Sequence, residues 1–186
     1  MSELETSRLY LRGWKDEDYE PFYRMSMDPR VMEFLPAFQD KKACDSFFNH
    51  MRESLSEQGW GFWAMERKED GVFMGIIGMH KPGPEFGVGE ECVEMGWRLA
   101  PEFWGNGYVT EAAREILRFG FEELDFPEIV SFTALGNTRS LAVMARLGME
   151  RDDRVFDLLV FPEDSPHRPH CISRLSREKW REKFRG

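Results

Sequence analysis

The stretch Phe103–Ala112, FWGNGYVTEA, places two glycines one residue apart, directly before a run that is typical of a helix start. Glycine loses much conformational entropy when the chain becomes ordered, so it marks a sharp bend or a close approach. The first N–H groups of a helix lack internal partners, and the helix dipole adds partial positive charge there. The stretch predicts either a tight turn into a helix or a loop that binds a phosphate or pyrophosphate.

Two common phosphate-binding motifs do not match this loop. A GxGxxG fingerprint would need glycine where Thr110 stands, and no Gly-Lys-Ser/Thr follows as a P-loop would require. The binding interpretation therefore needs support from a second part of the chain.

A second polar helix start follows thirty residues later, in GNTRSLAVMARLGME. Asn137, Ser140 and Met144 fall on one face of the expected helix, although Asn and Ser at such positions are often only caps. The strand before them, Ile129–Ala134, would run parallel to the strand Cys92–Leu99 as its crossover partner. Two helices would then begin at the same edge of a sheet, with a ligand between them.

The remaining patterns predict an α/β fold with a single mixed sheet of about seven strands flanked by helices, in the order βααβββαβαββ. The other expected elements are a strand with Leu9 and Leu11, a helix capped by Asp16 and interrupted at Asp28-Pro29, a helix capped by Asp40 with Ala43, Phe47, Met51 and Leu55 on one face, a hairpin turning at Glu69-Asp70-Gly71, a Pro/Gly-rich loop at 81–89, a helix from Tyr108 to about Leu124, a helix closed by Gly148, strands near 150–160 and 169–175, and a basic tail that favours helix.

The composition limits the possible partners. The 186 residues are 41% hydrophobic and 32% charged with a net charge of −9, which favours a soluble domain and an amine-bearing partner over nucleic acid. No signal peptide or membrane-spanning run is visible, so a cytoplasmic protein without membrane contact is expected. Cys44, Cys92 and Cys171 lie far apart without CxxC spacing, which favours reduced thiols and no metal.

Two linked motifs resemble a known family. VEMGWRLAPEFWGNGYVTEAAREILRFGF followed by NTRSLAVMARLGME is similar to the GNAT superfamily of N-acetyltransferases. Within it, the chain most resembles the RimJ/RimL-like group, which acetylates the N-termini of ribosomal proteins. TSRLYLRGW resembles the first strand of that group and HCISRLSREKW its last, so the likeness covers most of the chain.

The resemblance implies acetyl-CoA as cosubstrate and one acetyltransferase domain over residues 1–186. That domain would comprise acceptor-side helices at about 16–57, an acetyl-CoA-binding core at about 91–148, and C-terminal strands with a basic tail at 150–186. The expected cofactor-binding residues are Trp97, Arg98 and Leu99 for the pantetheine arm, Gly105, Asn106, Gly107, Tyr108, Val109 and Thr110 for the pyrophosphate, and Asn137 and Ser140 near the thioester.

The chain departs from the family pattern at four positions. Trp104 and Val109 fill the first and last positions of a loop pattern that usually reads Gln/Arg-x-x-Gly-x-Gly/Ala. Met144 stands where many members carry a tyrosine acid, and Phe132 stands where some carry a glutamate base. The commonest acid and base of the family are therefore both absent at those positions.

Glu94 and Ser140 are the expected catalytic residues. Glu94 shares a strand face with Gly96 and Arg98, and as a carboxylate on the strand expected to carry the thioester it would be the base or the ammonium anchor, directly or through water. Ser140 would protonate the leaving thiolate, and the N–H of Leu99 or a neighbour would stabilise the thioester oxygen. The alternatives are a solvated strand residue for Glu94 and a backbone-bonded hydroxyl for Ser140.

The histidines rank lower as candidate site residues. His80 ends a strand near the expected site but is more often structural. His170 and Cys171 are adjacent on a strand, so they point to opposite faces and form no dyad. His167 and His170 lack further ligands for a metal.

The acceptor pocket is expected from the first two helices and their connecting loop, with Glu33, Phe34, Trp60 and Phe62 as candidates. The acceptor amine would be a small molecule or a protein N-terminus, and the protein a monomer or a homodimer. Two other functions stay open: a catalytically silent acyl-CoA- or nucleotide-binding module on the same fold, and a plain interaction domain.

Overall fold

The computed structural model describes residues 3–83 and 92–184. The chain forms two compact units, which are described separately. The first unit comprises Met1–Met79 and Gly96–Ile116, and the second comprises His80–Met95 and Leu117–Gly186. Most of the expected loop at 81–89 lies outside the described residues.

The strands form one mixed sheet, which confirms the expected fold class. In the described residues the strand order is β1-β2-β3-β4-β5-β6-β8-β7, and the strands are β1 (Leu4–Glu5), β2 (Leu9–Arg12), β3 (Phe62–Arg67), β4 (Phe73–His80), β5 (Glu94–Leu99), β6 (Glu128–Ala134), β7 (Glu150–Asp157) and β8 (Pro169–Ser176). β5 pairs in parallel with β6, with Glu94 opposite Val130, so the expected parallel crossover is confirmed. The eighth strand, β1, has only two residues and is too short for an alternating pattern to reveal it.

The helices follow the expected order, with additional short ones. They are η1 (Asp16–Asp18), α1 (Tyr19–Met27), α2 (Pro29–Met32), α3 (Lys41–Gln58), η3 (Pro101–Phe103), α4 (Tyr108–Glu122), α5 (Thr138–Leu147) and α6 (Arg177–Phe184). Asp40 caps α3 by accepting a hydrogen bond from Ala43 N over 2.8 Å, and Gly148 ends α5 with φ +77°. These local signals were readable from sequence because caps and left-handed glycines act within a few residues.

Two expectations about the first helices were wrong. Asp16 is not a cap, because it lies inside η1. Instead the carboxylate of Asp18 accepts a hydrogen bond from Lys15 N over 2.8 Å and pairs with the buried Arg12. Position 18 is preferred because the buried guanidinium of Arg12, at the end of β2, needs a counter-charge.

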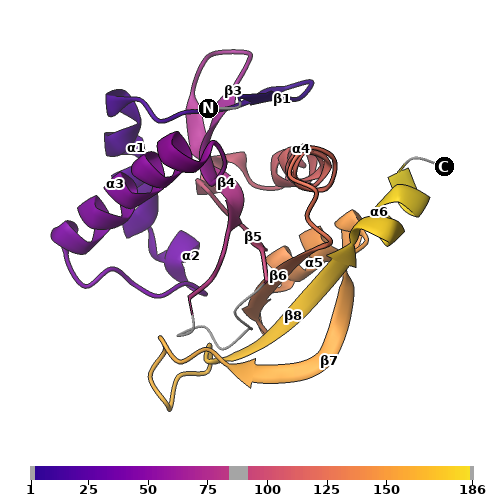
Figure 1. The fold of residues 1–186 in the computed structure, drawn as a ribbon. Helices are drawn as coiled ribbons and strands as arrows, with labels where there is room; N and C mark the ends of the chain where they lie inside the picture. Colours follow the sequence, from indigo (N-terminus) through magenta and orange to yellow (C-terminus); the bar gives the residue numbers. More distant parts are fainter. Residues whose placement is uncertain (1–2, 84–91, 185–186) are drawn as a thin grey trace. The chain divides into compact units, whose positions relative to one another are not determined.

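The expected buried face of α3 is confirmed at Met51 and Leu55 but is wrong by one position in the first half of the helix. Cys44, Phe48, Met51 and Leu55 are buried, whereas Ala43 and Phe47 are partly exposed. Residues spaced exactly four apart move progressively around a helix of 3.6 residues per turn. The observed spacing of four, three and four residues keeps the buried side chains on one face. Figure 1 shows α3 lying beside α1 within the first unit.

The second unit is built on the antiparallel strands β6, β8 and β7, around Val130 and Ile172. α6 continues directly from β8, as Figure 1 shows. β7 ends the strand order, most of its side chains are exposed, and its register with β8 shifts between Arg151 and Val155.

Candidate active site

The double-glycine loop has the backbone that its sequence predicts. Gly105 and Gly107 both have φ +78°, a left-handed conformation that L side chains rarely adopt. A Cβ at Gly105 would meet nothing within 4 Å, and one at Gly107 would meet only Arg8 Nη2 at 3.8 Å. The glycines therefore serve the backbone conformation and leave open space in front of the loop.

Side chains from within the loop hold this conformation. Trp104 Nε1 donates a hydrogen bond to the carbonyl oxygen of Leu99 over 2.7 Å. Asn106 Nδ2 donates to the carbonyl oxygens of Phe103 and Trp104 over 3.2 and 3.0 Å. Asn106 therefore stabilises the turn itself, while Tyr108 and the residues after it form the first turn of α4.

Arg8 adds a cation beside the loop that sequence reasoning missed. Its guanidinium lies 4.4 Å from the centre of the Tyr108 ring and donates to the carbonyl oxygen of Asn106 over 3.1 Å. Arg8 Nε also donates to Glu111 Oε2 over 2.6 Å. About a hundred residues separate these partners in sequence, so no local pattern could have indicated the contact.

Glu111 in the first turn of α4 fixes the segment that carries Arg8. Its Oε1 accepts hydrogen bonds from Thr6 Oγ1, Ser7 Oγ and Arg8 N over 2.6, 3.0 and 2.9 Å. Burial raises the pKa of Glu111, but the hydrogen bonds from Thr6, Arg8 and Ser7 together outweigh it, so the net pKa is lowered. The carboxylate therefore stays ionised at neutral pH and anchors Arg8 next to the loop.

The backbones of β4 and β5 approach closely near the expected pantetheine residues. A Cβ at Gly75 would lie 2.2 Å from the carbonyl oxygen of Arg98 and 2.8 Å from Leu99 Cα. Ala100 N donates to Met74 O over 2.9 Å. Trp97, Arg98 and Leu99 therefore occupy a tightly packed part of the first unit, and their contact with a pantetheine arm stays a prediction.

Asn137 and Ser140 form a closed cap at the start of α5. Asn137 Oδ1 accepts from Ser140 N over 3.2 Å, and Asn137 Nδ2 donates to Thr133 Oγ1 and Ser140 Oγ over 2.9 and 3.1 Å. Both amide hydrogens of Asn137 are thus used within the protein. Because Ser140 Oγ accepts in this arrangement, its own proton stays available for another acceptor.

Glu94 is buried and bonded to His80, which sequence reasoning had ranked low. Glu94 is 8% exposed, and its Oε2 makes a hydrogen bond with Nε2 of His80 at the end of β4. The side chain of His80 remains 35% exposed. The pair joins a protected carboxylate to an imidazole that solvent reaches, so Glu94 is not a solvated strand residue.

His170 lies within electrostatic reach of Glu94 but serves another purpose. It is buried, its Nδ1 lies 3.0 Å from the carbonyl oxygen of Arg168, and its ring packs near Phe132, Phe156 and Phe161. Burial lowers the pKa of His170, although the Arg168 carbonyl and the Glu94 charge oppose this. A neutral imidazole that donates from Nδ1 to this carbonyl fits these surroundings.

The expected acceptor residues are reachable in the first unit. Glu33 is exposed, and Phe34, Trp60 and Phe62 are partly exposed. The backbone of Phe62 is fixed because its carbonyl oxygen accepts from Trp14 Nε1 over 2.8 Å. That these four residues receive the acceptor stays a prediction.

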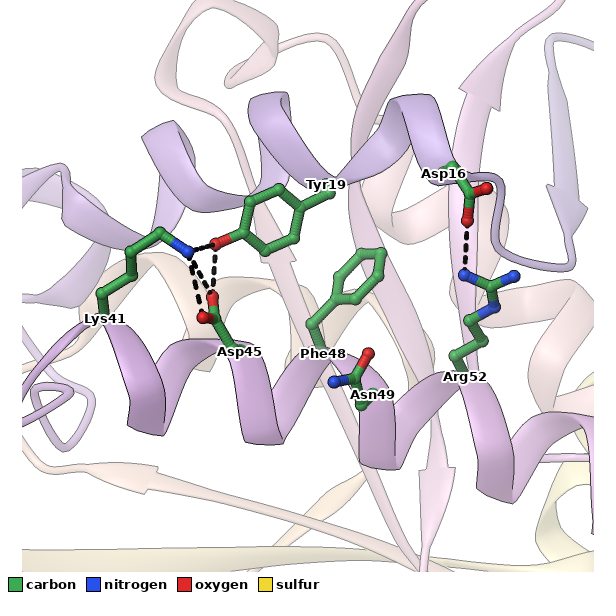
Figure 2. A pocket seen from close by; sticks show the side chains of 7 residues that line it. All are labelled: Asp16, Tyr19, Lys41, Asp45, Phe48, Asn49 and Arg52. Atoms are coloured by element: carbon green, nitrogen blue, oxygen red, sulfur yellow. Dashed lines mark hydrogen bonds and ion pairs between the residues drawn. The ribbon is translucent and has the colours of Figure 1, made fainter.

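A surface pocket of about 410 Å³ lies between η1, the start of α1 and α3, and Figure 2 shows its side chains. Its lining residues are Asp16, Tyr19, Lys41, Asp45, Phe48, Asn49 and Arg52. Lys41 bonds to Tyr19 and Asp45, and Arg52 pairs with Asp16 over 2.6 Å. Its charged groups thus satisfy one another, and none of the four expected acceptor residues lines it.

Two absences hold for residues 3–83 and 92–184. No group of three or more His, Cys, Asp or Glu side chains is placed to hold a metal ion there. Within the same residues, no helix combines the length and the apolar character needed to cross a membrane.

Comparison with known proteins finds relatives of the chain as a whole. The acetyltransferase (GNAT) domain family matches residues 8–150. The FsC-acetyl coenzyme A-N(2)-transacetylase of Aspergillus fumigatus is 30% identical over 183 residues, 95% of this chain and 77% of that protein. The putative ribosomal N-acetyltransferase YdaF of Bacillus subtilis is 32% identical over 88 residues, 47% of this chain and 46% of that protein.

The solved structures agree at the level of the fold. A crystal structure of an acetyltransferase from Agrobacterium tumefaciens is 27% identical with a TM-score of 0.76, covering 94% of each chain. The family match runs through both compact units, so they are parts of one domain. The chain belongs to the GNAT family of acetyltransferases.

Proposed function

We propose that the protein transfers an acetyl group from acetyl-CoA to a primary amine by direct attack in a ternary complex. The observation that carries the proposal is the buried Glu94 carboxylate on β5, bonded to His80. An amine must lose a proton to attack a thioester, and a carboxylate–imidazole pair can take that proton and pass it to solvent. Because His80 is partly exposed, it can release that proton to solvent.

Acetyl-CoA binding is supported by the loop before α4. The left-handed glycines lead into a fifteen-residue helix, and the backbone N–H groups from Gly105 to Thr110 are proposed to bind the pyrophosphate, with Arg8, which is paired with Glu111, beside them. These features favour a pyrophosphate. Trp97, Arg98 and Leu99 are proposed to carry the pantetheine arm through their backbone.

Each catalytic group has one task in this scheme. Glu94, relayed by His80, takes a proton from the amine as the new nitrogen–carbon bond forms. The N–H of Leu99 or a neighbour stabilises the oxygen that becomes negative. Ser140, held by Asn137 with its own proton available, gives that proton to the sulfur as the carbon–sulfur bond breaks.

The acceptor is proposed to be a protein N-terminus or a small amine. A protein N-terminus follows from the RimJ/RimL-like motifs and from the partial likeness to YdaF, whose name refers to a ribosomal acceptor. A small amine follows from the transacetylase of Aspergillus fumigatus, whose name describes an N(2) acceptor. We further propose a cytoplasmic protein, monomeric or homodimeric, without a metal.

The test is an acceptor screen that measures release of CoA from acetyl-CoA across peptides and small amines. Turnover with at least one amine, reduced in a folded Glu94→Gln variant, is the expected result. Binding of acetyl-CoA without turnover on any amine would favour the catalytically silent module instead. Absence of acetyl-CoA binding would overturn both.

A further inference from the structure

Arg98 is a partly exposed residue whose guanidinium has a buried Nε and pairs with no carboxylate among the described residues. Its Nη1 donates to Ser26 Oγ over 3.1 Å. Its Nε is inaccessible to solvent and has no hydrogen-bond partner in the described part of the chain. The guanidinium lies 5.5 Å from the ring centres of Phe38 and Phe47.

The surroundings of Arg98 disfavour its charge. Burial lowers its pKa to about 10, and the charge of Cys44 opposes this only in part. The side chain is nevertheless protonated at neutral pH. A buried charge without a partner costs free energy, and contacts with two aromatic rings offset this only in part. Ordinary core packing does not explain a guanidinium here.

The unused side of the guanidinium has a definite shape. Nε and the adjacent Nη2 lie along one edge of the planar group, while Nη1 is engaged with Ser26. Two parallel N–H groups along one edge match the two oxygens of a carboxylate, which binds arginine in a bidentate manner. Nε is inaccessible to solvent in this state, whereas Nη2 is not among the buried unpartnered atoms of the described residues, so a carboxylate would meet Nη2 first and reach Nε by displacing the groups that cover it.

The elements around Arg98 point to the acceptor as the molecule that brings the carboxylate. Ser26 belongs to α1, Phe47 to α3, and Phe38 to the segment 33–40 that connects α2 with α3. This is the region expected to receive the acceptor. The candidate pyrophosphate-binding loop of the same unit has its own cation, Arg8.

We infer that Arg98 binds a carboxylate of the acceptor, so the substrate class is a primary amine that also carries a carboxylate. The inference rests on the proposed acetyltransferase function. Two sources share this chemistry: a free amino acid, and a peptide N-terminus with an acidic side chain. In both cases Phe38 and Phe47 would flank the carboxylate–guanidinium pair.

The test compares matched acceptors with and without the charge. Amino acids and their amides form one set, and peptides that differ by glutamate or glutamine near the N-terminus form the other. The wild type should show a KM at least tenfold lower for the carboxylate member of one set, and that set names the source. Equal KM values within both sets would overturn the inference.

Arg98→Met and Arg98→Lys separate binding from structure. Arg98→Met should raise KM for the charged acceptor at least tenfold more than it raises KM for its amide, with a melting temperature no lower than that of the wild type. Arg98→Lys keeps the positive charge but loses the two parallel N–H groups. Its KM for the charged acceptor should therefore lie between those of the wild type and Arg98→Met. If KM changed equally for the charged acceptor and its amide, Arg98 would have a structural role. A lower melting temperature without a KM difference between the two acceptors would show the same.

An equilibrium measurement keeps this inference separate from the proposed function. Binding of the same amino acids and peptides, followed by NMR without acetyl-CoA, should be lost in Arg98→Met. Such loss without turnover on any amine would refute the enzyme and leave the carboxylate site standing. Turnover without any carboxylate preference would refute the site and leave the enzyme standing.

Discussion

The proposed proton transfer from the amine depends on single side chains. Glu94 is buried on β5 and bonded to His80, although Met144 and Phe132 replace the acid and base that the family resemblance would supply. An α-amino group has a pKa of about 7.7–8.0, so roughly a tenth of it or slightly more is already neutral near pH 7, whereas a lysine-like amine with a pKa near 10.4 is neutral in only about one molecule in 10³. The contribution of Glu94 as a general base to the rate should therefore depend on the pKa of the acceptor amine.

Glu94→Gln should reduce kcat/KM by about tenfold or less for a peptide N-terminus, and a pH of about 8.5 should recover much of the loss. For a lysine-like amine the loss should be larger, within the roughly 10²–10⁴-fold typical of a general base, and should persist at that pH. The measurement is the pH–rate profile of both proteins. Superimposable profiles would show that Glu94 takes no part in proton transfer.

The His80 contact supplies the control for this prediction. If the imidazole relays the proton of Glu94, His80→Ala and Glu94→Gln act on one step, and the double variant should lose hardly more than the more damaged single one. Losses that multiply would place His80 outside the relay.

At the level of elements, acetyl-CoA binding at the turn into α4 should depend more on the charge than on the size of a side chain at position 107. Gly107→Asp would put a carboxylate beside Arg8 and in front of the helix N-terminus, so it should abolish acetyl-CoA binding without unfolding the protein. Gly107→Asn is the matched control, because asparagine has the same shape without the charge and tolerates φ +78° comparatively well. Calorimetric titration of both variants checks this, and equal affinities would refute the pyrophosphate assignment.

The link between the N-terminal segment and α4 has a predictable pH dependence. Glu111→Ala removes a carboxylate that accepts from Thr6, Ser7 and Arg8, which should cost about 1.5–3 kcal/mol of unfolding free energy. Because the folded pKa of Glu111 is lowered, its contribution is present above the unfolded value of about 4.3 and is lost as pH falls through the folded value. Urea unfolding at pH 7 and pH 3 should show the difference between wild type and variant shrinking in acid.

The helices and strands could be predicted from the sequence more fully than the contacts between them. Caps such as Asp40 and Asn137 and the end at Gly148 were readable because each acts within one helical turn. The pairing of Arg8 with Glu111 and of His80 with Glu94 joins separate elements, and no periodic pattern encodes it. The first half of α3 shows a related limit, since a spacing of exactly four residues selected Ala43 and Phe47, whereas the 3.6-residue turn buries Cys44 and Phe48.

For the whole molecule, the clearest prediction is stabilisation by the cosubstrate. A ligand that binds only the folded chain adds about 2.7 kcal/mol to its stability at one hundred times its Kd. Saturating acetyl-CoA should therefore raise the melting temperature measurably, and free CoA, which carries the same pyrophosphate, should do so too. No shift with either compound would contradict acetyl-CoA binding and, with it, the proposed function.

The exposed strand at the end of the sheet order, β7, is poorly suited to pair with a strand of another copy. β7 carries acidic and basic side chains along its length, among them Asp152 and Arg154, and its pairing with β8 breaks register in the middle. A strand from another chain would have to follow that kink and desolvate those charges. Concentrated protein should thus resist templated, amyloid-like stacking at this strand, and a homodimer, if one forms, is expected to use another surface.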